Sequence, residues 1–195
     1  EFPNSVTNAA NRTAAKLNMG YSFGKPLLVK TTSNGWVALV TSGYNNGTNA
    51  GDSGGDGIGH LYVLNPQTGD LIKDIPTPGC ATTPASDPCG LAQLSASTTN
   101  THAVDYVYGG DLKGNLWRFD FTGASSAAWS VSKFTTLVDG AGNPQPITSA
   151  PTLSVVSSQR MVQIGTGQYL GESDIPGTAG ANFAASQTQT IYAFQ

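Results

Sequence analysis

The chain has 195 residues, of which 38% are hydrophobic and 11% are charged, and its formal net charge at pH 7 is -3. This length is enough for one domain with a real hydrophobic core. The weak negative charge and the lack of a basic run argue against binding of nucleic acid or of an anionic membrane. No apolar run in the sequence reaches the length of a membrane span.

The first expected unit is a four-stranded meander that begins near residue 24. Residues 1–19 show little pattern, and we treat them as a lead-in that is poorly ordered or forms a short helix. Asn34-Gly35 is the strongest short signal for a β-hairpin, and residues 65–69 supply a second turn of Asn, Pro, Thr and Gly. The strands expected around these turns cover 25–30, 36–44, 61–64 and 70–75.

The same pattern then repeats in two further units. The second unit is centred on a hairpin in which Val104, Tyr106 and Tyr108 alternate with other residues, as in a half-buried strand. Gly114 lies in the turn and can adopt a positive φ. Its expected strands cover 91–95, 105–109, 116–121 and 129–138, and those of the third unit cover 149–153, 161–165 and 190–194. Subtracting Leu61 from the equivalent Leu116 gives a repeat of about 55 residues.

Repeats of roughly 40–50 residues with four strands each are typical of β-propeller blades. We therefore expect an all-β fold over residues 20–195, namely a partial or modified β-propeller of about three four-stranded antiparallel blades. The blades are placed at approximately 24–77, 91–138 and 149–195. Because propellers close with about 4–8 blades, three blades would be a segment of a larger ring or an open arc whose edges are capped or paired.

The two cysteines, Cys80 and Cys89, lie in a loop rich in proline and glycine. We expect them to form a disulfide, which indicates an oxidising compartment. Two free thiols are the alternative. A zinc site is disfavoured because the spacing is wrong and no histidine is near in sequence.

A glycine-rich polar loop at residues 45–57 is a partial match to a calcium-binding loop. Asp52 and Asp56 occupy its first and fifth positions, but Gly54 at the third position and Val63 at the twelfth offer no side-chain oxygen. A glycine-rich turn with solvated aspartates is the alternative, and so many glycines make a poor preorganised cage.

We expect the histidines and most of the aromatic residues to have structural roles. His60 and His102 have no serine or cysteine partner at a spacing that suggests nucleophilic catalysis. Six aromatic residues are expected to pack between blades, with an exposed cluster that stacks on a ligand as the alternative. They are Trp36, Trp117, Trp129, Tyr106, Tyr108 and Phe119.

Five segments in a fixed order carry a resemblance to a known family. They are GYSFGKP (20–26), WVALVTSGYN (36–45), DYVYGGDLKGNLWRFD (105–120), GTGQYLG (165–171) and QTQTIY (187–192). Together they resemble the C-terminal propeller domain of the PilY1/PilC family of type IV pilus biogenesis and tip-adhesin proteins. The resemblance covers roughly residues 20–195.

The resemblance implies a modified β-propeller that is exported beyond the inner membrane and has no enzymatic activity. Its implied roles are pilus assembly, support of pilus extension against retraction, and surface attachment. The implied partners are pilins or minor pilins and host surface receptors, with no nucleic acid and no membrane span. The implied location is the periplasm, the outer membrane or the pilus tip.

In several members of this family a calcium loop precedes the Asp-Tyr-x-Tyr strand, which corresponds here to residues 97–105. Only Asp105 keeps a carboxylate of that pattern, since positions 97, 99 and 101 carry hydroxyl groups and His102 replaces the usual glycine. A hard divalent cation needs more negatively charged oxygen than this. We therefore expect no cofactor, with calcium at Asp52, Asp56 or Asp105 as the alternative.

Two other functions need comparison because quinoproteins share the Gly-x-Leu-Tyr-x-Leu-Asn blade motif. A quinoprotein-like dehydrogenase is disfavoured because the chain has no adjacent cysteine pair and is too short to enclose a cofactor on a propeller axis. A scaffold propeller with an unspecified partner is the other alternative.

Overall fold

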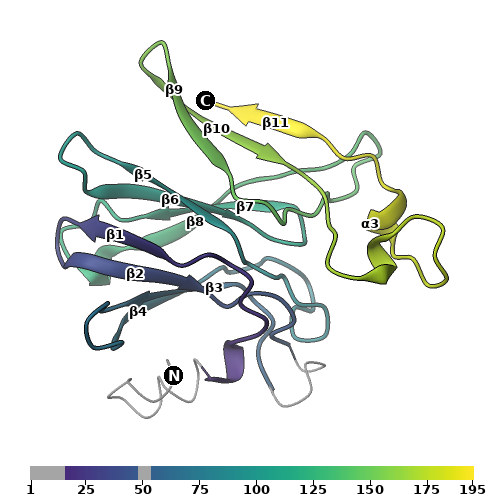
Figure 1. Cartoon of the computed structure of the whole chain (residues 1–195), viewed down its shortest axis with the longest axis horizontal. Helices are drawn as coiled ribbons and strands as arrows, with labels where there is room; N and C mark the ends of the chain where they lie inside the picture. Colours follow the sequence, from purple (N-terminus) through teal and green to yellow (C-terminus); the bar gives the residue numbers. More distant parts are fainter. Residues whose placement is uncertain (1–15, 48–53) are drawn as a thin grey trace.

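The computed structural model describes residues 16–47 and 54–195, and it arranges them in three antiparallel β-sheets (Figure 1). The strand orders are β1-β2-β3-β4, β5-β6-β7-β8 and β11-β10-β9. These sheets confirm the all-β prediction, with the difference that the third sheet has three strands where the other two have four. The lead-in expected at 1–19 falls largely outside the described residues.

The strands are short and are joined mainly by tight turns and polar loops. The first sheet comprises β1 (Leu27–Thr31), β2 (Gly35–Thr41), β3 (His60–Leu64) and β4 (Leu71–Pro76). The second comprises β5 (Leu94–Thr98), β6 (Val104–Gly110), β7 (Asn115–Asp120) and β8 (Ser130–Thr136). The third comprises β9 (Thr152–Val156), β10 (Gln159–Gly165) and β11 (Ile191–Phe194). Helical pieces among the described residues include the turns η1 (Ser126–Ala128) and η2 (Glu172–Asp174), the short helix α3 (Phe183–Ser186) and a helical stretch at residues 16–18.

The two hairpins with the clearest turn signals form where the sequence predicts them. Gly35 has a φ of 68° at the β1–β2 turn, and Gly114 has a φ of 74° at the β6–β7 turn. Both values lie in the left-handed region, which glycine adopts without a steric penalty. In the second hairpin the register pairs Val107 with Phe119 and Gly110 with Leu116. Both faces of this hairpin are buried, because Val107 and Phe119 lie in one core cluster and Tyr108 and Leu116 lie in another.

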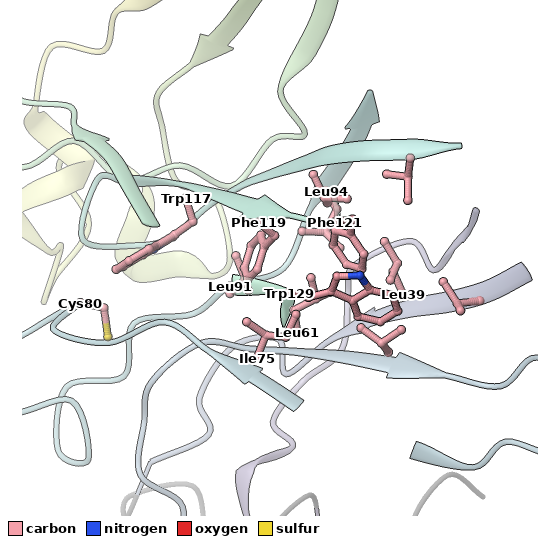
Figure 2. Close-up of a cluster of buried hydrophobic side chains, with 14 of the residues drawn as sticks. Leu39, Leu61, Ile75, Cys80, Leu91, Leu94, Trp117, Phe119, Phe121 and Trp129 are labelled. Carbon is pink, nitrogen blue, oxygen red and sulfur yellow. The ribbon is translucent and has the colours of Figure 1, made fainter. Parts of the chain in front are cut away.

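The main core lies between the first and second sheets (Figure 2). Leu39 and Leu61 of the first sheet and Trp117 and Phe119 of the second are at most 1% exposed. Phe121 and Trp129 pack against each other in the same cluster, with ring centroids 4.8 Å apart. Each fully buried large side chain contributes about 1.5–3 kcal/mol, so this cluster accounts for much of the cohesion between the first two sheets.

A second core joins the second sheet to the third. Leu116, Ile147 and Ile164 are buried there, and Phe134 makes an edge-to-face contact with Phe194 at a centroid distance of 5.7 Å. Trp36 is an exception among the predicted inter-blade aromatics. It is 57% exposed because it pairs with exposed Lys30 at the hairpin end of β2.

The first strands of the three sheets lie next to one another in order, because β1 contacts β5 and β5 contacts β9. This succession is the arrangement of inner strands in neighbouring propeller blades. Among the described residues, no helix is both long enough and apolar enough to cross a membrane.

Candidate functional site

A groove of about 770 Å³ is lined by residues from all three units. This volume is within the range of small-ligand sites, about 300–1,000 Å³. Loops rather than strands form its lining, and binding residues are disproportionately found on loops held by a rigid scaffold. Representative lining residues are Tyr21, Phe23, Leu112, Pro144, Leu170 and Phe183.

Three aromatic rings, which we call the aromatic ladder, line the groove on the side of the first unit: Tyr21, Phe23 and Tyr44. Neighbouring ring centroids are 6.3 Å apart for Tyr21 and Phe23 and 6.1 Å apart for Phe23 and Tyr44. Tyr21 is 61% exposed and Phe23 is 67% exposed, whereas Tyr44 is buried. Burial raises the pKa of Tyr44 to about 12, so its hydroxyl stays protonated at physiological pH.

The backbone holds the aromatic ladder rigidly. Tyr21 N–H donates to Tyr44 O at 2.7 Å, and Tyr44 N–H donates to Tyr21 O at 3.0 Å. Gly43 makes this close pairing feasible, because its φ is 74° and a Cβ there would lie 2.0 Å from Tyr21 O. The exposed rings are therefore presented by a fixed backbone, which lowers the entropy lost when a ligand binds.

The disulfide loop forms another part of the groove wall. Cys80 and Cys89 are bonded, as predicted, and both are buried. Cys89 O accepts a hydrogen bond of 2.7 Å from Leu112 N–H, which joins the loop to the β6–β7 turn. Across this junction the Lys113 ammonium pairs with the Asp87 carboxylate, and these are the two charged side chains among the groove's described lining residues.

The connection from β10 to β11 lines the groove from the third unit and is organised by Asp174. This carboxylate accepts hydrogen bonds from Leu170 N–H at 2.5 Å, Gly171 N–H at 3.2 Å and Gln168 Nε2 at 2.8 Å, as well as from Asn182. Burial alone would raise the pKa of Asp174, but these donors outweigh it and the pKa is lowered. The ionised carboxylate thus fixes the loop that carries Leu170.

Asp56, one of the residues considered as an alternative calcium ligand, lies against His60. His60 Nε2 is 3.1 Å from Asp56 Oδ2, and His60 Nδ1 is 2.9 Å from Asp74 Oδ1. Burial alone would lower the pKa of His60, but hydrogen bonds with the two carboxylates raise it to about 9. Both ring nitrogens are occupied and the residue is only 4% exposed, so His60 has a structural role and no open position for a substrate.

Asp105, the second described candidate ligand, is buried against donors from its own chain. Its carboxylate accepts hydrogen bonds from Ser97 Oγ, from Tyr106 N–H at 2.8 Å and from Arg160 Nη1. Burial would raise the pKa of Asp105, but these donors and the charge of Arg160 lower it overall. Arg160 therefore already supplies a positive charge at this carboxylate.

Asp111, at the centre of the β6–β7 hairpin, does more than favour a turn. Its carboxylate accepts hydrogen bonds from Lys113 N–H and Asn115 N–H, both at 2.9 Å, and from Trp117 Nε1 at 2.8 Å. Burial raises the pKa of Asp111 despite these donors. The side chain is fully buried. It links the β6–β7 turn to the indole of Trp117 in the main core by hydrogen bonds.

The three candidate calcium ligands are only partly described by the structure. Asp52 lies outside the described residues, and Asp56 and Asp105 make separate contacts with His60 and Arg160. Within residues 16–47 and 54–195, no group of three or more His, Cys, Asp or Glu side chains is arranged to hold a metal ion. Sequence reasoning did not single out the aromatic ladder or Arg160, because both depend on contacts between distant segments.

A family model described as the PilY1 β-propeller domain matches residues 3–194. The chain belongs to this family. A solved structure supports the assignment: the crystal structure of the Pseudomonas aeruginosa PilY1 C-terminal domain is similar with a TM-score of 0.74 and 27% sequence identity. That match covers 92% of this chain and 38% of the solved chain.

Two curated relatives of this PilY1-type chain are type IV pilus proteins. A type IV pilus biogenesis factor PilY1 homolog from Xylella fastidiosa is 33% identical over 177 residues, covering 80% of this chain. The type IV pilus biogenesis factor PilY1 of Pseudomonas aeruginosa strain PAO1 is 29% identical over 198 residues, covering 90% of this chain. The chain spans 11% and 16% of the lengths of these two relatives.

Proposed function

We propose that this PilY1-type chain is part of a non-enzymatic type IV pilus biogenesis and adhesion protein. In this role the propeller segment provides protein–protein contacts for pilus assembly, for control of retraction and for surface attachment. The observation that carries the proposal is the family match over residues 3–194, together with relatives whose names describe pilus biogenesis factors.

The chemistry of the described residues supports a binding role. Three side chains belong to residue types that often act as acids or bases in catalysis: His60, Asp105 and Asp111. Each of them is buried and forms hydrogen bonds or ion pairs with other residues of the same chain. A general base needs a position within hydrogen-bond reach of a substrate proton, and these three groups offer none. The groove, in contrast, presents exposed aromatic rings on rigid loops, as binding surfaces do.

We place the protein in the cell envelope, in the periplasm, at the outer membrane or on the pilus tip, with pilins or minor pilins and host surface receptors as partners. The disulfide between Cys80 and Cys89 supports this placement, because disulfides persist in oxidising compartments such as the periplasm and the cell surface.

The test is a deletion of the gene in its own bacterium, in strains with and without the pilus retraction motor. The proposal predicts that the deletion removes surface pili when retraction is active and that pili return when the retraction motor is also removed. Complementation with the intact gene should restore pili in the first strain. Normal piliation of the deletion strain would contradict the proposal.

A further inference from the structure

A second pocket lies between the second and third sheets and shares no lining residue with the groove. It has a volume of about 320 Å³ and is lined by residues of β5, β6, β9 and β10. We propose that this pocket, which we call the seam pocket, binds a small monocarboxylate with a short apolar body, whose carboxylate is held by Arg160 and Tyr108. The volume is at the lower end of the range for small-ligand sites.

Arg160 has hydrogen-bond donors to spare. It is the charged residue of the seam pocket's described lining. Its contacts with Asp105 and Ser97 both use Nη1, whereas a guanidinium carries five N–H donors. The side chain is 51% exposed, and its Nε and Nη2 donors have no acceptor among the described residues. They are therefore available to a second carboxylate, which arginine binds well through parallel hydrogen bonds.

The hydroxyl of Tyr108 is a further donor without a partner. Tyr108 lines the seam pocket and is only 9% exposed, yet its hydroxyl makes no hydrogen bond within the described part of the chain. A buried tyrosine hydroxyl usually has such a partner. This hydroxyl is not among the side-chain atoms that are shielded from solvent, so a ligand can reach it. Burial raises the pKa of Tyr108, which keeps the hydroxyl protonated and able to donate.

The charges around this hydroxyl favour a single negative charge on the ligand. After burial, which is the largest cause, the cations Arg118 and Arg160 lower the pKa of Tyr108 and the anion Asp105 raises it. Two cations and one anion thus act on the same point, and a monoanion there would balance them. A phosphate dianion would bring a second negative charge toward Asp105, with no further cation to offset the repulsion.

The rest of the wall favours an apolar body. Leu153, Val155 and Val162 line the seam pocket, and Val155 is 69% exposed. Covering such a side chain is favourable in proportion to the apolar area removed from water. An inorganic anion would leave this surface exposed, whereas a carboxylate with a short hydrocarbon chain would cover it and still reach Arg160 and Tyr108.

The experiment titrates the chain with isocaproate, a carboxylate with a leucine-like branched chain, and follows amide chemical shifts by NMR. We expect saturable binding with a Kd of about 1 mM or lower. Arg160→Gln should weaken binding about tenfold, and Tyr108→Phe, which removes only the hydroxyl, should weaken it a few-fold. Lys30→Ala is the matched control, because Lys30 is an exposed cation outside the seam pocket, and it should bind like the parent chain.

A carboxylate of this kind belongs either to a free acid or to the C-terminus of a peptide, and a second titration separates these sources. It uses a short uncharged peptide that ends in leucine, with its C-terminus free or amidated. Binding of the free form at least as tight as that of isocaproate, lost on amidation, would assign the seam pocket to a chain terminus. Weaker or absent binding of the peptide would assign it to a free acid.

Three outcomes would overturn the proposal. They are no binding of either carboxylate, equal binding of the uncharged isocaproamide, and binding that is unchanged in both Arg160→Gln and Tyr108→Phe. Amide shifts far from the seam pocket verify that each variant is folded. The inference goes beyond the proposed function, because carboxylate binding is measured on the isolated chain and piliation is measured in cells, so either can fail without the other.

Discussion

Arg160 on β10 donates from its guanidinium to the buried carboxylate of Asp105 on β6, and this ion pair joins the third sheet to the second. The two residues are 55 positions apart in sequence. The Asp105 side chain is 6% exposed and the Arg160 side chain is 51% exposed. The pair therefore places a cation from the next sheet at the carboxylate that the sequence analysis considered as an alternative calcium ligand.

Removing the cation should destabilise the contact between these sheets. We expect Arg160→Ala to lower the free energy of unfolding by about 1–2 kcal/mol, less than for a fully buried pair because the guanidinium is half exposed. Urea denaturation followed by tryptophan fluorescence measures the change. Lys30→Ala, which removes an exposed cation on β1, is the matched control and should change stability by less than about 0.5 kcal/mol.

Arg160→Ala made in an Asp105→Asn background separates the contribution of the ion pair to stability from that of Arg160 packing. If the pair matters, Arg160→Ala should cost less once the carboxylate is gone, and the double-mutant cycle should show a coupling of at least about 0.5 kcal/mol. Additive effects of the two substitutions would contradict a stabilising role for the pair.

Calcium should have little effect on the stability of this chain. Asp105 already accepts hydrogen bonds from Arg160, Ser97 and Tyr106, and Asp56 is occupied by His60. We expect the same Tm in a few millimolar calcium chloride as in EDTA, because a ligand raises Tm only when it binds the folded state preferentially. A rise of several degrees that is specific to calcium over magnesium would show a calcium site.

Loss of the buried Asp111 carboxylate should lower stability more than loss of the partly buried Asp120 carboxylate at the end of β7. Asp111→Ala leaves the donors of Trp117 and Asn115 buried without an acceptor, and we expect a loss of about 3 kcal/mol. Asp120→Ala is the control, because Asp120 at the end of β7 is only partly buried and accepts a hydrogen bond of 2.8 Å from Thr122 N–H. Urea midpoints of the two variants provide the comparison, and equal midpoints would argue against the role assigned to Asp111.

The stability of the chain should fall as the pH rises toward 9. The contacts with Asp56 and Asp74 raise the pKa of His60 to about 9 in the folded state, against an ordinary value of 6.5. A raised pKa contributes stability that is fully present below about 6.5 and is lost as the pH rises through about 9. Since a tenfold change in proton affinity corresponds to about 1.4 kcal/mol, the loss of stability is at most about 3 kcal/mol.

Unfolding free energies at pH 6.5 and 9.5 test this dependence. The parent chain should lose stability between these values, while His60→Gln, whose side chain does not titrate, should lose less. The carboxylates of Asp56 and Asp74 and the ring of Tyr62, which stacks on His60 at 5.6 Å, are the groups that face the imidazole. An identical pH profile for both chains would contradict the assignment to His60.

The sequence predicts the elements of this fold better than the contacts between them. The Asn34-Gly35 turn and the alternation around Tyr106 locate hairpins directly, because turn chemistry and period-two burial are local properties. The disulfide is also predictable, since Cys80 and Cys89 share one short loop. The prediction for Trp36 is wrong because alternation identifies a face of a strand but not how far along the strand the neighbouring sheet extends.

The site residues are harder to predict because their environments come from distant segments. Asp105 can be singled out by sequence, but its partner Arg160 comes from another sheet. Tyr21 and Phe23 read as part of a short aromatic motif, and only the folded chain shows that they stand exposed beside Phe183 in one groove.

The central claim is the association with type IV pili, and the most direct measurement uses pili sheared from the source bacterium. The sheared fraction is probed with an antibody raised against residues 20–195, in the parent strain and in a mutant that cannot assemble pili. We predict that the protein sediments with pili and that this signal disappears in the mutant. Equal amounts in the soluble periplasm of both strains, with none in the pilus fraction, would contradict the claim.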